Sequence, residues 1–263
     1  MKDFIEFNEL NMKKDFNMTE PHSHDHYEFY FLLEGEREFF MKDKILNVGP
    51  DSLIIIPPFL IHKTEGGPYK RVNVNISDKY FSDYEKKIIS DIIDKCVVKL
   101  DKKHSSAIYH LLSEGATVDA INIPNAKEIM ACFIHTILML LGRSELTACD
   151  GNSVTALNDC SVNILKIVNF LNHNYNKKLT LKEIADKFYI SRTALCTSFN
   201  KTMNCSVMKY VTELRISAAQ KLLDNTEKSI EEISEICGFS SASYFGLAFK
   251  NERGKSPLNY RKR

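Results

Sequence analysis

Residues 181–204 read LKEIADKFYISRTALCTSFNKTMN, and residues 230–254 follow the same plan as IEEISEICGFSSASYFGLAFKNERG. The large apolar positions recur at an offset of 49 residues before a central turn and 50 residues after it. The matched pairs are Leu181 and Ile230, Ile184 and Ile233, Ile190 and Phe239, Phe199 and Phe249, Asn204 and Gly254, and Tyr210 and Tyr260. The offset changes within the turn, where a change in length is tolerated. The chain therefore contains two copies of one small helical unit.

Each copy predicts a short helix, a tight turn and a second helix. In the first copy, Ser191 is suited to cap the second helix, because its hydroxyl accepts from a free amide of the first turn. Asn204 fits a left-handed helix end, and Ser240 or Ser241 and Gly254 play the same two parts in the second copy. The pattern predicts helix-turn-helix units at 181–202 and 230–252, joined by a helix over 207–223. A solenoid of αα-hairpins, the alternative, does not suit two copies on a basic background.

Charge is distributed unevenly along the 263 residues, although the formal net charge is only +1. Residues 1–158 carry 18 Lys+Arg against 24 Asp+Glu, a net −6, whereas residues 159–263 carry 17 against 10, a net +7. A basic block beside an acidic one indicates that only the C-terminal part meets a polyanion.

The segment 160–263 resembles the AraC/XylS-type DNA-binding domain. The resemblance rests on Ile190-Ser191-Arg192, Leu195, Phe199, Leu214-Arg215-Ile216, Ala219, Leu222-Leu223, Gly238-Phe239-Ser240, Ser243-Tyr244-Phe245, Phe249-Lys250, Gly254, Ser256-Pro257 and Tyr260-Arg261. It implies two helix-turn-helix units on one face of double-stranded DNA, reading successive major-groove segments about 34 Å apart.

The second helix of each unit supplies the expected DNA contacts. These DNA-binding residues are Ser191, Arg192, Thr193, Cys196, Thr197, Asn200, Lys201, Ser241, Ala242, Ser243, Gly246, Leu247 and Lys250. Gly246 and Leu247 depart from the family, which usually carries polar or basic side chains there. Because bidentate readout of bases needs Arg, Lys, Asn or Gln, we expect phosphate contacts and DNA shape to dominate. Either the second unit contributes mainly phosphate contacts, with the weak, shape-led binding that we favour, or Leu247 meets a thymine methyl or a partner such as RNA polymerase.

The first 80 residues favour strands, with short β-branched or aromatic runs at 27–33, 37–41, 52–56 and 71–76. His22-x-His24-x-x-x-Glu28, six residues and Gly35 resemble the first half of a cupin signature. Pro57-x-Phe59-x-x-His62 resembles the second half, with Phe59 where Gly is usual. These motifs predict a cupin-like barrel. The resemblance to the AraC/XylS family implies that this barrel binds a small-molecule effector, a sugar or another polar metabolite. The expected effector-binding residues are His22, His24, Glu28, Tyr30, Arg37 and His62; His26 is expected to point outward.

Two alternatives use the same four groups. In metal-binding cupins, residues matching His22, His24, Glu28 and His62 hold Fe, Mn, Ni or Zn, and imidazole and carboxylate suit such ions. The chain then is a metal sensor or a metal-dependent cupin enzyme with a DNA-tethering domain. We favour the reading without cofactor or catalysis, because a helix-turn-helix tail fits a sensor.

The predicted organisation is α+β with two domains: a barrel at 1–80, a helical connector at 81–150, a linker at 151–159 and an all-α double helix-turn-helix domain at 160–263. Residues 126–141 form an apolar helix that is either a dimerisation helix or a core helix under the barrel. The chain is expected to be a homodimer. Seven cysteines without a CxxC pair, and no signal-like N-terminus, predict a cytoplasmic protein that does not enter the membrane.

Overall fold

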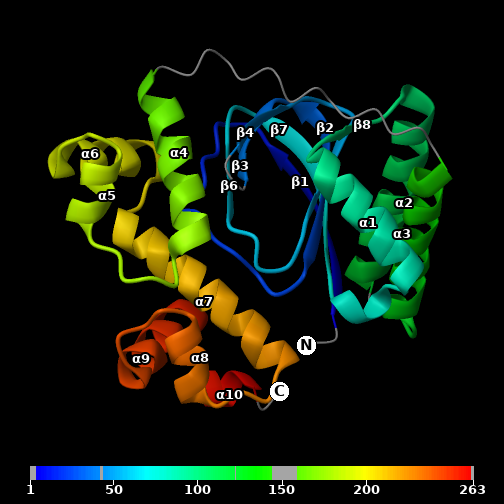
Figure 1. The fold of residues 1–263 in the computed structure, drawn as a ribbon. Helices are drawn as coiled ribbons and strands as arrows, with labels where there is room; N and C mark the ends of the chain where they lie inside the picture. The colour runs from blue at the N-terminus through cyan, green and yellow to red at the C-terminus, as the bar shows by residue number, and fades with distance from the viewer. Residues whose placement is uncertain (1–3, 42–43, 122, 144–158, 262–263) are drawn as a thin grey trace.

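A computed structural model describes residues 4–41, 44–121, 123–143 and 159–261 (Figure 1). Its strands all lie in the first hundred residues. They are β1 (Ile5–Met12), β2 (Tyr27–Gly35), β3 (Arg37–Met41), β4 (Lys44–Val48), β5 (Ser52–Ile56), β6 (His62–Glu65), β7 (Tyr69–Ile76) and β8 (Val98–Lys99). The four predicted runs at 27–33, 37–41, 52–56 and 71–76 are strands, and β1, β4, β6 and β8 are further strands that the sequence analysis did not predict.

The strands form two antiparallel sheets. One sheet has the order β1-β7-β2-β5-β8, and the other has the order β4-β3-β6. Side chains alternate across each strand, so that Tyr30 and Leu32 of β2 face the other sheet while Phe29 and Phe31 face away from it. Tyr30 and Leu32 pack in the space between the sheets with Phe39 of β3. This space is the interior of the barrel.

Three helices cover the outer face of the five-stranded sheet (Figure 1). They are α1 (Asp83–Lys95), α2 (Lys102–Ile121) and α3 (Ala126–Arg143), and a 3-10 turn (Asp78–Tyr80) precedes α1. Ser82 and Glu85 form a capping box at the start of α1. The stretch predicted as a helical connector thus shares a hydrophobic core with the sheet, and its strand β8 pairs with β5.

The apolar helix α3 is a core helix on one side only. Ile134, Ile137 and Leu138 are buried against α1, α2 and the sheet, whereas Cys132 and Met139 are exposed on the other side. His135 hydrogen-bonds to Glu85 of α1 through Nδ1, which accounts for an imidazole among apolar neighbours. Within the described residues, no helix combines the length and the apolarity needed to cross a membrane.

The C-terminal part is entirely helical. It comprises α4 (Asp159–Asn174), α5 (Leu181–Lys187), α6 (Arg192–Met203), α7 (Val207–Asn225), α8 (Ile230–Ile236), α9 (Ala242–Arg253) and α10 (Pro257–Arg261). Two separate cores match the two copies of the repeat, with Phe199 buried in the first and Phe249 in the second. The long helix α7 contributes Tyr210 to the first core and Leu223 to the second, and so joins them.

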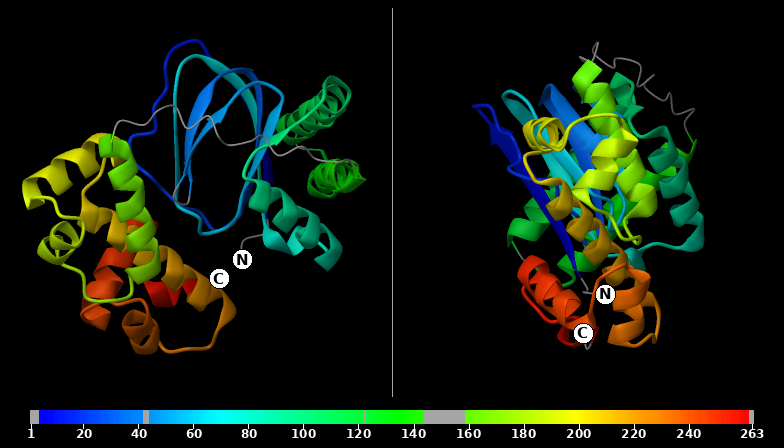
Figure 2. Two further views of the ribbon diagram at one scale, coloured as in Figure 1. Left: turned by 45° about the horizontal axis from the view of Figure 1, so that its top comes forward. Right: turned by 60° about the vertical axis from the view of Figure 1, so that its left-hand side comes forward.

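The molecule is layered, from the helices α1–α3 through the two sheets to the C-terminal helices (Figures 1 and 2). Phe40 of β3 and Ile61 lie on the outer face of the three-stranded sheet and are buried in the same core as Ile164 and Val168 of α4. The helix α4 therefore packs on this sheet, whereas α1–α3 cover the other sheet. The predicted linker, 151–159, lies almost wholly outside the described residues.

Candidate functional site

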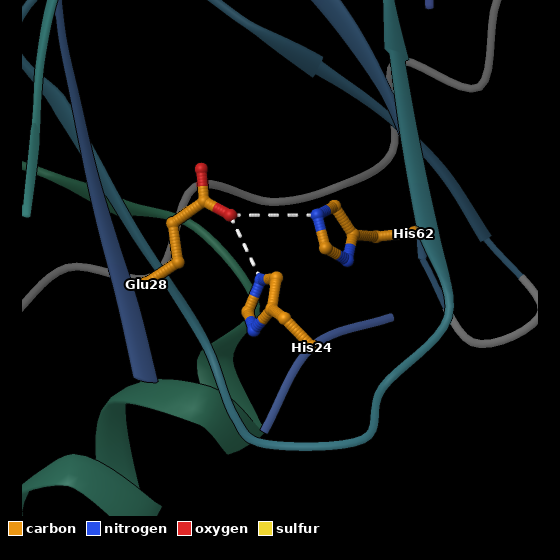
Figure 3. Close-up of side chains that lie close together, drawn as sticks. All are labelled: His24, Glu28 and His62. Carbon is orange, nitrogen blue, oxygen red and sulfur yellow. Dashed lines mark hydrogen bonds and ion pairs between the residues drawn. The ribbon is translucent and has the colours of Figure 1, made fainter. Parts of the chain in front are cut away.

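Three of the sequence-predicted effector residues converge at one end of the barrel interior (Figure 3). Glu28 lies near the start of β2, His62 is the first residue of β6, and His24 lies on the segment that precedes β2. Glu28 Oε2 is 3.0 Å from His24 Nε2 and 3.4 Å from His62 Nε2. Suitable ligand atoms of the three residues all lie within 4.8 Å of one another. We call His24, Glu28 and His62 the histidine cluster.

Glu28 and His62 are buried and His24 is partly buried, and burial and hydrogen bonding together set the protonation of His24 and Glu28 and of their neighbour His22. Burial, with the neighbouring His62 and His24, lowers the pKa of His22 to about 4. Burial also lowers the pKa of His24, against the opposing hydrogen bond with Glu28. Burial alone would raise the pKa of Glu28, but hydrogen bonds with His24 and His62 hold that pKa well below its usual range. At neutral pH the site thus presents a carboxylate beside neutral imidazole rings at His22 and His24.

Of the other three predicted effector residues, only His22 packs beside this cluster. The His22 ring packs 4.4 Å from the His62 ring. Tyr30 and Arg37 are almost fully buried and face the barrel interior, farther along β2 and β3. The prediction that His26 points away from the site is wrong, because its ring stacks on His24 at a centroid distance of 4.0 Å. The alternation of an extended chain favours the observed position, because His22, His24 and His26 are spaced two residues apart and so share one face.

The first helix-turn-helix unit has the predicted caps. Ser191 accepts from the Ala194 amide at 3.1 Å, and Asn204 ends α6 with a left-handed φ of 56°. The turn between α5 and α6 places Tyr189 at φ 55° with its side chain 97% exposed. All seven predicted DNA-binding residues of this unit are exposed, whereas Leu195 and Phe199 of the same helix are buried.

The second unit follows the same geometry. Ser241, of the two serines considered, is the cap of α9 and accepts from the Tyr244 amide at 3.2 Å. Gly254 ends α9 at φ 72°. Ser243, Leu247 and Lys250 are exposed, and Leu247 shows 59% of its surface. The remaining predicted DNA-binding residues of this unit are the exposed Ser241 and the partly exposed Ala242 and Gly246.

Comparison with known proteins matches both parts of the chain to family models. A helix-turn-helix domain matches residues 184–263, and an AraC-like ligand binding domain matches residues 11–72. The chain belongs to the AraC/XylS-type transcriptional regulators. Within this family, the Msm operon regulatory protein of Streptococcus mutans is 25% identical over 248 residues, which cover 92% of this chain and 86% of that protein.

The melibiose operon regulatory protein of Escherichia coli is 22% identical over 267 residues, covering 97% of this chain and 87% of its own. Among solved structures, the C-terminal domain of AraT, a response regulator from Geobacillus stearothermophilus, is 28% identical. That match covers 40% of this chain and 88% of that one, with a TM-score of 0.38. This AraC-type regulator is therefore a DNA-binding transcriptional regulator with a ligand-modulated helix-turn-helix domain.

In this AraC-type regulator the barrel and the DNA-binding helices make specific polar contacts. The Ser23 hydroxyl donates to Glu213 of α7 at 2.7 Å, and Arg253 of α9 donates to both Ser23 and Glu213. Tyr260 of α10 donates to Asp25 at 3.2 Å. A cavity of about 590 Å³ lies beside these contacts, and His22 and Ser23 both line it.

A second set of contacts connects the loop before β6 to α7 of the regulator. The Ser217 hydroxyl donates to the Phe59 carbonyl at 2.6 Å, and the Phe59 amide donates to the His24 carbonyl at 2.7 Å. On the neighbouring strand, the Lys63 ammonium lies 3.5 Å from the Thr202 carbonyl of α6. Residues beside the histidine cluster thus contact the DNA-binding helices directly.

Sequence reasoning missed several residues of this arrangement. Arg71 and Asn73 of β7 face the barrel interior, beside Tyr30. The alternation of Arg71-Val72-Asn73-Val74 predicts a half-buried strand, but it does not show that the polar face lines the interior. The contacts of Ser23 and Asp25 had no such signal, since they join segments about 190 and 235 residues apart.

Proposed function

We propose that this regulator senses a sugar or another small polar metabolite in its barrel, in the cytoplasm where its DNA partner lies. Residues 4–143 form the sensing part and residues 159–261 the DNA-binding part. The effector contacts His22, His24, Glu28, Tyr30, Arg37 and His62. The similarity to regulatory proteins of the melibiose and Msm operons supports a metabolic effector. No catalytic step enters this proposal.

One observation carries the coupling between effector and DNA. The segment from His22 to Asp25 directs its histidines toward the cluster, while Ser23 and Asp25 contact the DNA-binding helices. The three-stranded sheet repeats this pattern, because Phe39 faces the interior and Phe40 faces α4. An effector that shifts the inner side chains therefore shifts the surface on which the DNA-binding part rests.

Weakening the contact between Phe40 of β3 and the helix α4 tests the coupling between the barrel and the DNA-binding part. Phe40→Ala is expected to raise the affinity for DNA several-fold, because the DNA-binding part is held against an acidic domain that repels phosphate. Loss of the buried ring weakens docking by about 2 kcal/mol on the usual scale for apolar burial. The affinity is measured by the fluorescence anisotropy of a labelled genomic DNA fragment, chosen because it co-purifies with the full-length protein. Met139→Ala, an exposed residue of α3, is the matched control.

An unchanged affinity of Phe40→Ala, in a protein with the wild-type circular dichroism spectrum, would contradict the coupling. A reduced affinity would contradict the direction, and would mean that docking arranges the two recognition helices for DNA.

We further propose that α6 and α9 enter successive major-groove segments and bind largely through phosphates. Arg192, Lys201 and Lys250 are exposed cations on these helices. Their neighbours Cys196, Thr197 and Gly246 offer no bidentate reader for a base. Specificity then depends on DNA shape and on contacts with thymine methyl groups.

Leu247 gives a direct test of this interface. Leu247→Arg is expected to raise affinity across many DNA sequences and to steepen the salt dependence by about one unit of slope, because a cation then faces the phosphates. Leu247→Ala is expected to change affinity little. Salt titration of anisotropy measures both variants. Abolished operator binding in a folded Leu247→Ala protein would instead make Leu247 a specific apolar reader.

We also propose a homodimer. Cys132, Thr136 and Met139 are exposed at spacings of four and three residues on the side of α3 away from the sheet, and a second copy of the chain covers this side. Sedimentation at several protein concentrations measures the dimer.

RNA polymerase is proposed as a partner of Leu247. The test is transcription with purified RNA polymerase: a Leu247→Ala protein that binds DNA normally but activates transcription poorly supports this contact.

A metal ion is a second candidate ligand of the barrel. The observation that favours it is the convergence of ligand atoms from His24, Glu28 and His62 within 4.8 Å, a donor set that suits Fe, Mn, Ni or Zn. Such an ion would supply a positive charge that holds these three side chains together. Near-stoichiometric metal in the purified regulator, measured by elemental analysis, would favour this candidate over a metal-free effector site.

A further inference from the structure

The barrel interior contains buried polar atoms without partners beyond the histidine cluster. Within the described part of the chain, the Tyr30 hydroxyl, Arg37 Nη2, Arg71 Nη1 and Asn73 Oδ1 are buried and make no hydrogen bond. Nearly all buried polar atoms of proteins have a partner, so each of these needs an explanation. All four side chains come from β2, β3 and β7, the strands that enclose the interior.

Two of these side chains are guanidinium groups without a carboxylate. Among the residues described, neither Arg37 nor Arg71 forms an ion pair. Glu28, the carboxylate of the interior, already accepts from His24 and lies 3.4 Å from His62. A buried charge without a counter-charge is costly in a protein interior. The interior therefore carries an excess of positive charge that a bound anion would neutralise.

Aromatic rings hold the two guanidinium groups in place without neutralising them. The Arg37 guanidinium carbon lies 4.3 Å from the centre of the Tyr69 ring, and the Arg71 guanidinium carbon lies 5.2 Å from that of Tyr30. Tyr30 also lies close to Arg37, because the two side chains interact electrostatically. The pairing of Leu32 with Arg71 and of Tyr30 with Asn73 in the β2–β7 ladder places Asn73 next to them.

The remaining contacts of Arg37 orient its unpartnered nitrogen. Arg37 Nε donates to Thr64 Oγ1 at 3.1 Å, and Nη1 donates to the Gly66 carbonyl at 2.8 Å. Nη2 is then the nitrogen left for a ligand. A cavity of about 600 Å³ borders Arg37 and is lined by Glu36 and Glu38, by the end of β4 with Gly49, and by Gly66 and Gly67.

We propose that the barrel binds a small hydroxylated anion, such as a sugar acid or a sugar phosphate, whose oxyanion lies between Arg37 and Arg71. Guanidinium groups form strong charge-assisted hydrogen bonds with carboxylate and phosphate. The side-chain oxygen Oδ1 of Asn73 accepts a hydrogen bond from a hydroxyl of the ligand, and the Tyr30 hydroxyl donates a hydrogen bond to the ligand. This inference rests on the proposed function, that the barrel holds the effector, and it specifies the effector's charge.

Three probes of one carbon skeleton test the inference: glucose, glucuronate and glucose 6-phosphate. The full-length protein is titrated with each probe at constant ionic strength, and binding is followed by thermal unfolding and calorimetry. We expect at least one of the two anions to raise the Tm and to bind at least tenfold more tightly than glucose. Arg71→Met removes the charge but keeps an unbranched side chain, and is expected to weaken anion binding at least tenfold. Arg71→Lys keeps the positive charge and is expected to retain part of the anion binding.

Arg192→Met is the matched control, because it removes an exposed arginine of the DNA-binding part. Arg71→Met binding the anions as tightly as the wild type would overturn the inference, and so would a wild type that binds neither anion. If glucose alone binds, and His24→Ala abolishes this binding, the proposed sensing function stands and the anionic effector is refuted.

Discussion

Replacing Phe245 with alanine is expected to lower the free energy of unfolding of the DNA-binding part by about 3–5 kcal/mol, the usual range for a buried phenylalanine. The Phe245 side chain is fully buried, and its ring centre lies 4.9 Å from that of Phe239 and 5.6 Å from that of Phe249. Since a domain is stable by only about 5–15 kcal/mol, this loss removes most of the margin that keeps α8, α9 and α10 together. DNA binding through α9 is expected to disappear with it.

The measurement is urea denaturation followed by circular dichroism, together with anisotropy on the recovered genomic fragment. Leu247→Ala provides the control within the same helix, because the Leu247 side chain is 59% exposed and its loss is expected to change stability by less than about 0.5 kcal/mol. Equal stabilities of the Phe245→Ala and Leu247→Ala variants would show that the core of the second unit does not depend on its aromatic cluster.

The DNA-binding part could be predicted from the sequence because its determinants are local. Caps, turns and core positions of each unit lie within about 25 residues, and the second copy confirms the reading of the first. Ser191, Asn204 and Gly254 occupy the predicted cap positions. Only the choice between Ser240 and Ser241 was left open, and hydrogen bonding to the Tyr244 amide decides it.

The barrel was predicted less completely because part of its burial comes from other segments. The strand β6 reads His-Lys-Thr-Glu, which has no apolar signal, yet His62, Lys63 and Thr64 are all buried. Its inner face lines the barrel, and its outer face lies beneath α6, where Lys63 pairs with Glu65 and approaches Thr202. A strand covered on both sides by distant segments cannot be recognised from its own pattern.

The candidate site likewise contains residues that the sequence could predict and residues that it could not. His24, Glu28 and His62 were predicted from their resemblance to a cupin signature, and the structure brings their ligand atoms together. Arg71 and Asn73 of β7 were not predicted as site residues, because the alternation of a strand does not show which of its polar side chains lie inside the barrel. The apolar character of α3 likewise did not show which side meets the sheet and which side is exposed.

Acidification is expected to destabilise the protein through His22 between about pH 6.5 and pH 4. Burial lowers the pKa of His22 from 6.5 to about 4, so the unfolded chain binds a proton at this residue more readily than the folded protein does. Stability is therefore complete above about pH 6.5 and is lost as the pH falls toward 4. The loss amounts to about 2 kcal/mol by pH 5. His24 adds to it in the same direction, because burial lowers its pKa too.

Urea denaturation at pH 7 and pH 5 measures this loss, and His22→Gln is expected to reduce it by about 2 kcal/mol because the variant has no proton to gain. The depressed pKa of Glu28 acts in a lower window, since its contribution is present above pH 4.5 and is lost as the pH falls through the folded value. The two residues are thus separable by pH. His173→Gln, at an exposed position of α4, serves as the control and is expected to leave the slope unchanged. If His22→Gln retained the full pH dependence, the loss would belong to other groups, and the His22 ring would not be held neutral by burial between the barrel and the DNA-binding helices.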